Sequence, residues 1–177
     1  MLVLFYIAAI VAIASTVMVI TRTNAIHALL NLIVSLLSVA FIFFIAGAPF
    51  VAALEVIIYA GAIMVLFVFV VMLLNISQET VKEQSQHLIP STWIVPFILS
   101  LILLVELLIV LSGAYQGGQN FTIIQPKEVG ISLYTKYALG VEMAGMLLMA
   151  GIVGAYHLGK GRKTITHRYL EEGTSNG

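Results

Sequence analysis

Five long apolar stretches, separated by polar segments, set the pattern of this chain. A helix of about 20 apolar residues, rising roughly 1.5 Å per residue, is long enough to cross a hydrocarbon core of about 30 Å. Each stretch has close to that length and holds no more than one charged side chain. The pattern therefore predicts an all-α integral membrane protein, a bundle of five transmembrane helices. The predicted spans cover about residues 2–20, 28–48, 54–74, 93–111 and 137–158.

The composition agrees with this prediction and removes several kinds of chemistry. Hydrophobic residues make up 61% of the chain and charged residues 9%, whereas soluble domains have about 45–50% and about 25%. The formal net charge is zero, so charge gives no reason to expect a nucleic-acid partner. The chain has no cysteine, which excludes disulfides, thiolate metal sites and cysteine-bound iron–sulfur clusters. His27 and His157 stand at the edges of different spans, so we expect no metal site.

The connections between the spans differ in length and in composition. Residues 21–24 form a short polar link, and Gly47-Ala48-Pro49 is suited to a sharp reversal between antiparallel helices. Residues 78–86 and 116–136 are polar, and we expect both to be aqueous loops, with Pro126 as a helix breaker in the second. The short links predict that the first three spans form a compact group.

Basic residues predict the orientation, because cytoplasmic flanks of membrane proteins carry an excess of Lys and Arg. With the N-terminus outside, six of the eight basic residues face the cytoplasm, four of them in the tail that follows the last span. We therefore expect the N-terminus outside and the C-terminus cytoplasmic. Residues 1–158 are predicted to form a single five-helix transmembrane domain, and residues 159–177 a polar cytoplasmic tail.

The third span has an uneven composition. Ala60, Gly61 and Ala62 come first, and a dense block of β-branched and aromatic residues follows them. The small residues let a neighbouring backbone approach, and glycine weakens a helix by about 1 kcal/mol relative to alanine. Such a junction between a weak and a stiff segment is a place where one extra residue can enter a helical turn as a π-bulge, a feature frequent at functional positions.

This span resembles the third helix of subunit J of bacterial NADH:quinone oxidoreductase (respiratory complex I), the counterpart of mitochondrial chain six. The signature of that family is an acidic residue followed by Tyr-Ala-Gly-Ala-Ile-Met-Val-Leu-Phe, and residues 55–75 match it throughout. Residues 21–30 and 141–151 are also similar to the family. The resemblance thus extends over nearly the whole chain.

The resemblance implies a membrane subunit of a complex that passes electrons from NADH to quinone and moves protons across a bacterial cell inner (plasma) membrane. NADH, FMN, iron–sulfur clusters and quinone would belong to the complex, and none of them is expected to be bound by this chain. Its partners would be other membrane subunits, especially those near the quinone site and the small adjacent helical subunits, together with lipids. In the family, a change between bulged and regular forms of the third helix accompanies the coupling of quinone chemistry to the proton path.

These considerations select candidate residues but no catalytic, cofactor-binding or metal-binding ones. A charge inside hydrocarbon costs about 2.5–3.5 kcal/mol on insertion scales, and such side chains usually face protein or water. Each proton-path candidate also has a plain interpretation, namely a helix-entry anchor for Glu55, packing for Tyr59 and an interfacial cap for Glu142. The candidates for coupling or the proton path are Glu55, Tyr59 and Glu142. The candidates for a helix switch are Gly61, Ala62, Ile63, Met64, Val65 and Phe67.

Two alternatives to this function stay open. The nearer one is a subunit of a related cation antiporter or membrane-bound hydrogenase complex. The other is a self-contained small transporter, although the chain has no internal repeat of the kind that many such folds contain. Glu106 lies deep in the fourth span, and we interpret it as a packing contact with a neighbouring subunit.

Overall fold

The structure, a computed structural model, describes residues 2–74, 91–113 and 123–160. Within these ranges the chain is helical and contains no strand, and five helices are long and apolar enough to cross a membrane. The prediction of an all-α chain with five spans is therefore confirmed. In chain order the elements are α1 (Leu2–Thr21), α2 (Ala25–Ile45), α3 (Pro49–Leu54), the π-helix η1 (Glu55–Ile63), α4 (Met64–Leu74), α6 (Ser91–Leu111), α7 (Pro126–Thr135) and α8 (Ala138–Gly159).

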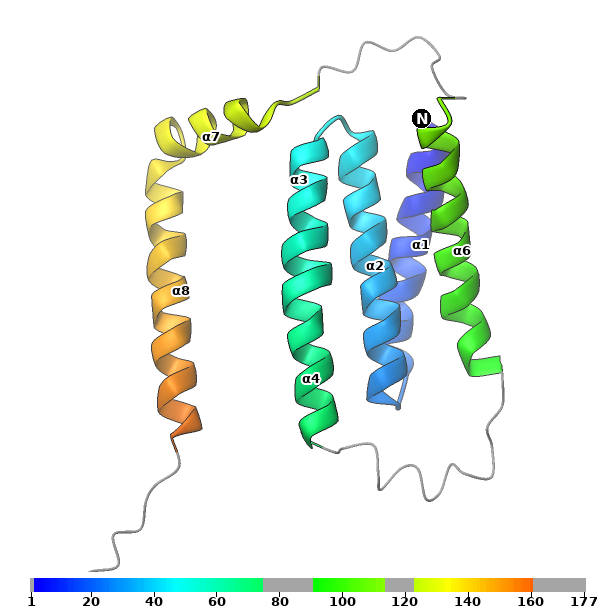
Figure 1. The fold of residues 1–177 in the computed structure, drawn as a ribbon, viewed down its shortest axis with the longest axis horizontal. Helices are drawn as coiled ribbons and strands as arrows, with labels where there is room; N and C mark the ends of the chain where they lie inside the picture. Colours follow the sequence, from blue (N-terminus) through cyan, green and yellow to red (C-terminus); the bar gives the residue numbers. More distant parts are fainter. Residues whose placement is uncertain (1, 75–90, 114–122, 161–177) are drawn as a thin grey trace, which may run out of the picture. The chain divides into compact units, whose positions relative to one another are not determined.

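The chain divides into two compact units, Met1–Pro126 and Lys127–Gly177. In the first unit α2 is central, because it contacts α1, α6 and all three segments of the third span, Pro49–Leu74 (Figure 1). The single five-helix domain and the orientation both stay predictions. The predicted loop at residues 78–86 and almost the whole predicted tail lie outside the described residues.

The ends of α2 follow from local chemistry. The Asn24 side chain caps the start of the helix, because its Oδ1 accepts the Ile26 backbone N–H at 2.9 Å. Gly47 turns the chain with a φ of 85°, a conformation that side chains disfavour. Pro49 then opens α3 as its first residue, where its missing N–H leaves no helix bond unmade. The second span therefore ends earlier than predicted, and the third begins at Pro49 instead of residue 54.

Two apolar clusters hold α1, α2 and α6 together. The first contains Leu4, Ala8, Phe41 and Ile45, with Ile42 and Val110 packed against it. The second contains Val11, Val34 and Leu103, with Ile7, Leu99 and Ile102 packed against it. Both clusters take residues from all three helices, so they fix the register of α6 against the α1–α2 pair.

Hydroxyl groups also bind α1 to α2 beside these clusters. Ser38 Oγ donates to the Ala8 carbonyl oxygen at 2.6 Å, and Ser35 Oγ donates to the Ala12 carbonyl oxygen at 3.3 Å. Thr16 Oγ1 and Ser35 Oγ also lie 2.8 Å apart. Small and hydroxyl-bearing residues allow close approach and hydrogen bonding between membrane helices. These bonds cross from one helix to the other, so they set the antiparallel register of the pair.

The second unit corrects one prediction. Residues 116–136 were expected to be a loop with Pro126 as a breaker, yet the structure has the helix α7 at Pro126–Thr135. Proline is well suited to the first position of a helix, and Glu128 in the first turn is favoured by the helix dipole. Pro126, which would break a helix from an interior position, is therefore the first residue of a helix here. The helix α8 comes next, and its residues are largely exposed.

Replacing Ala8 by leucine should lower the stability of the α1–α2 pair. Ala8 is 0% exposed, and its carbonyl oxygen accepts the Ser38 hydroxyl, so the larger side chain must push the helices apart. We expect a loss of about 1–3 kcal/mol in the free energy of unfolding. Reversible unfolding of the full chain in mixed micelles measures this loss. Ile10→Leu is the control, because Ile10 is 66% exposed, and an equal effect of both changes would contradict the assignment of Ala8 to the interface.

Candidate functional site in the third span

The third span changes its winding twice. The π-helix η1 at Glu55–Ile63 lies between the α-helical segments α3 and α4. At its end, the Met64 backbone N–H is shared between the carbonyl oxygens of Gly61 and Tyr59, and the bond to Tyr59, five residues earlier, is the π-helical one. The winding keeps backbone groups paired inside the span, which a lipid environment demands. A π segment of nine residues is uncommon and therefore marks this span as a site of interest.

A side chain at Gly61 would crowd the backbone of its own helix. A Cβ added there would lie 3.1 Å from the backbone carbonyl oxygen of Val56. Val56 precedes Gly61 by five residues, and in π winding the carbonyl group of residue i−5 lies next to residue i. The oxygen that a side chain at Gly61 would crowd is therefore the one that π winding places beside it. Glycine accommodates this contact because it has no side chain.

The third span is held on one side only. Met64 is 1% exposed and Ala52 is 7% exposed, and both are buried against the rest of the first unit. In contrast, Ile57 is 65% exposed and Phe69 is 60% exposed. The helix that packs against α3, η1 and α4 is α2. Much of the apolar surface of the span therefore remains open to lipid or to another chain.

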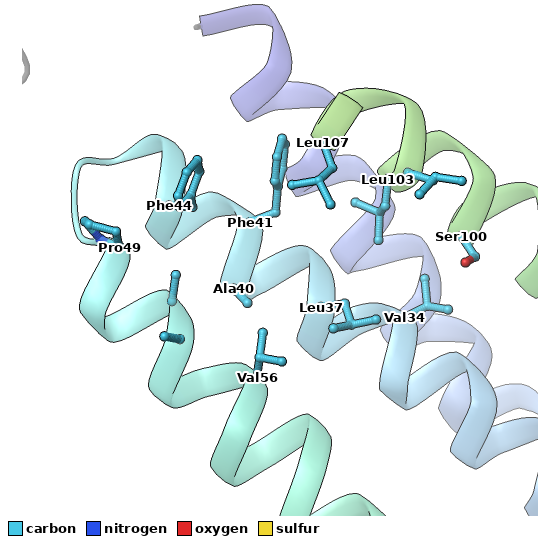
Figure 2. A pocket seen from close by; sticks show the side chains of 13 residues that line it. Val34, Leu37, Ala40, Phe41, Phe44, Pro49, Val56, Ser100, Leu103 and Leu107 are labelled. Atoms are coloured by element: carbon cyan, nitrogen blue, oxygen red, sulfur yellow. The ribbon is translucent and has the colours of Figure 1, made fainter. Parts of the chain in front are cut away.

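A cavity of about 450 Å³ lies beside the first part of η1 (Figure 2). It separates the third span from α6 and is bounded by α2, and its walls are almost wholly apolar. Of the described residues that line it, Ser100 alone has a polar side chain. From the third span, three residues of α3 and Val56 of η1 reach this cavity. The cavity is lined by Val34, Leu37, Ala40, Phe41, Phe44, Pro49, Ala52, Ala53, Val56, Ser100, Leu103, Leu104 and Leu107.

The structure places the proton-path candidates in two parts of the chain. Glu55 is the first residue of η1 and is half-buried, and Tyr59 lies in the middle of η1 and is 50% exposed. Glu142 belongs to α8, in the second unit, and is exposed. Among the described residues, no group of three or more His, Asp or Glu side chains could hold a metal ion. The roles of these residues stay predictions.

The helix-switch candidates are divided by the end of η1. Gly61, Ala62 and Ile63 lie in the π segment, whereas Met64, Val65 and Phe67 lie in α4. The observed π segment therefore begins before the small residues, at Glu55, and ends where the β-branched and aromatic block starts. Met64 is the first α-helical residue after it and is enclosed by the bundle.

Sequence reasoning underestimated Glu106. Instead of facing outward from the chain, Glu106 is 3% exposed within the first unit. Its two carboxyl oxygens have no hydrogen-bond partner among the described residues. The signal was present in the spacing, because Leu103, Glu106 and Val110 succeed one another at intervals of three and four residues and share a helix face. Leu103 and Val110 both pack into the apolar clusters.

Comparison with known proteins identifies the family. A family model described as NADH-ubiquinone/plastoquinone oxidoreductase chain 6 matches residues 15–158. The chain belongs to this family. A relative from Pseudomonas aeruginosa, NADH-quinone oxidoreductase subunit J, is 55% identical over 157 residues, which cover 88% of this chain and 95% of the relative. The resemblance found in the third span is therefore confirmed.

Further members of the chain 6 family agree over similar lengths. A relative named NADH-quinone oxidoreductase subunit J from Escherichia coli K12 is 51% identical over 156 residues, which cover 88% of this chain and 85% of that protein. A relative of the same name from Buchnera aphidicola (subspecies Schizaphis graminum) is 45% identical over 159 residues, covering 90% of this chain and 98% of that protein. The chain is thus similar to these relatives over most of its length.

Replacing Gly61 by alanine should shift η1 toward α-helical winding. The added Cβ meets the Val56 carbonyl oxygen at 3.1 Å, and rewinding moves that oxygen away. We expect the Met64 N–H to leave the Tyr59 carbonyl and to bond one residue later, at Ala60. A high-resolution structure of the variant full chain in lipid discs measures the change. Gly130→Ala in α7 is the control, because a Cβ there meets nothing within 4 Å; an unchanged η1 in Gly61→Ala contradicts the proposed crowding.

Proposed function

We propose that the chain is a membrane subunit of a proton-translocating NADH:quinone oxidoreductase. In this proposal, its third span helps couple quinone reduction to proton movement by changing between π and α winding. The observation that carries the second part is the π-helix η1, Glu55–Ile63, inside a transmembrane helix of a chain 6 family member. The names of the relatives support the first part, since the proteins that match at 51–55% identity are called NADH-quinone oxidoreductase subunit J. They favour this function over the related antiporter and hydrogenase complexes.

The role proposed for the chain is mechanical and electrostatic. It has no cysteine with which to bind an iron–sulfur cluster. NADH, FMN, the clusters and the quinone are accordingly assigned to other subunits of the complex. What this chain can supply is a helix that changes shape and carboxylates that face either protein or water.

The geometry of a winding change gives the proposal its physical content. Each residue of an α-helix turns the chain by about 100°, since one turn takes 3.6 residues. Removing one inserted residue from the winding of η1 would rotate Glu55 by about that angle relative to Met64. Met64 is fixed by burial at 1% exposure, whereas Glu55 is only half-buried. A small change in hydrogen bonding would therefore move the carboxyl group from one environment to another.

The surroundings of η1 support such a change. The cavity beside Ala52, Ala53 and Val56 gives the moving turn room on the α6 side. The short link at Gly47 joins α3 to α2 at the other end of the span, so α3 would turn together with Glu55.

Replacing Gly61 by valine tests the switch. The branched side chain should crowd the Val56 carbonyl and disfavour the π form, which lowers NADH:quinone turnover severalfold more than it lowers incorporation of the subunit. Turnover of membranes is measured beside the stoichiometry of the subunit in the purified complex. Gly130→Val is the matched control, since open space surrounds that position in this chain. Normal turnover in a fully assembled Gly61→Val complex would refute the switch. Absence of the unaltered chain from the purified complex would refute its membership of that complex.

Replacing Glu55 by glutamine tests the carboxylate at the start of η1. Glutamine keeps the shape and can still form hydrogen bonds but cannot exchange a proton, so proton pumping per electron should fall while assembly stays unchanged. The measurement is NADH-driven acidification of inverted membrane vesicles together with the rate of quinone reduction. Glu128→Gln is the control, because Glu128 is exposed on α7. Unchanged pumping in Glu55→Gln would remove Glu55 from the proton path.

A further inference from the structure

The interface of α1, α2 and α6 encloses an acidic side chain that the third-span mechanism does not use. Glu106 of α6 is 3% exposed, and neither carboxyl oxygen has a hydrogen-bond partner within the part of the chain that the structure describes. Buried polar groups in proteins almost always have such a partner. The exception requires a physical explanation.

The position of Glu106 follows from the two apolar clusters. On α6, Glu106 lies between Leu103 of the second cluster and Val110, which packs against the first. On α1, Ala8 belongs to the first cluster and Val11 to the second. Glu106 therefore lies at about the level of Ala8, with an apolar cluster on either side along the bundle axis.

No cation faces this carboxyl group from the described elements around it. The only titratable side chain of α1 is Tyr6, which is 57% exposed, and that of α2 is His27. The His27 ring packs on Trp93, near the opposite end of α6 and about 20 Å along the helix from Glu106. Across the cavity, the titratable side chains of the third span are Glu55 and Tyr59, which add no positive charge.

Neutral donors near Glu106 are also engaged. The Ser38 hydroxyl contacts Ala8 and so lies at the same level, but it donates its proton to the Ala8 carbonyl oxygen at 2.6 Å. An ionised carboxylate needs donors for its charged oxygens, whereas a protonated carboxyl group carries no charge and costs less to leave unpaired. An unpaired charge in this apolar setting would be strongly unfavourable.

We propose that Glu106 is a proton-binding site inside this subunit. The carboxyl group holds a proton and is a neutral acid while α1, α2 and α6 are packed around it. Water reaches it, and accepts the proton, only when that interface opens. The site is separate from η1 and does not depend on the winding of the third span or on the activity of a complex.

Infrared spectroscopy of the full chain in lipid discs at neutral pH tests the proposal. The C=O stretch of a protonated carboxyl group is separate from the carboxylate bands, so the two forms can be counted independently. Glu106→Gln should remove the contribution of one group from the acid band and leave the carboxylate bands unchanged. Glu128→Gln is the matched control, because Glu128 is exposed on α7, and it should reduce the carboxylate bands by one group.

A second variant protects the test against misfolding. Circular dichroism establishes whether the Glu106→Gln variant keeps its helix content. If that variant loses helix content, Glu106→Asp is measured in its place. Aspartate retains a carboxyl group, so it should shift the acid band without removing it. Loss of one group from the carboxylate bands in Glu106→Gln overturns the proposal, as does an acid band that neither variant alters. The measurement uses neither NADH nor quinone, so its failure is distinguishable from failure of the proposed function.

Discussion

The constraint on which this structure depends is the need to pair every backbone N–H and C=O group away from water. Inside hydrocarbon an unpaired group costs several kcal/mol, so a crossing segment must satisfy its own backbone. Four of the five spans of this chain do so as α-helices, and the third does so with a π segment between two α segments. Changing the winding alters which carbonyl each N–H meets and leaves the pairing intact. A helix can therefore change shape within the membrane without exposing its backbone.

The first unit combines a firmly held part with a loosely held one. Close contact between α1 and α2 relies on Ala8 and on the hydroxyl groups of Ser35 and Ser38, which bond across the pair. Apolar clusters add α6 to that pair. Within the first unit, the third span packs mainly on α2, and its interior contact depends largely on Met64. The span that carries η1 and Glu55 is therefore the more loosely held part of this unit.

The polar groups of the bundle divide along the same line. Glu55 is half-buried at the start of η1, whereas Glu106 is enclosed between apolar clusters. The two carboxyl groups have similar chemistry in water and differ here because of their surroundings. The chain belongs to the chain 6 family, and its relatives are named as subunits of NADH-quinone oxidoreductase. Both carboxyl groups therefore lie in a protein related to subunits of that enzyme.

The sequence by itself determined the solvent, the number of spans and the family, because hydrophobic length and the third-span motif are local properties that residues 55–75 display without any partner. It also marked Gly61 and its neighbours as a weak point of the helix. It missed α7, because Pro126 can start a helix or break one, and the residues on either side of it decide which. Only the tertiary structure decided that η1 begins at Glu55, that Met64 is the anchored residue and that Glu106 faces inward. These depend on which helices pack together, and contacts between residues far apart in the chain leave no trace in the hydropathy of a single span.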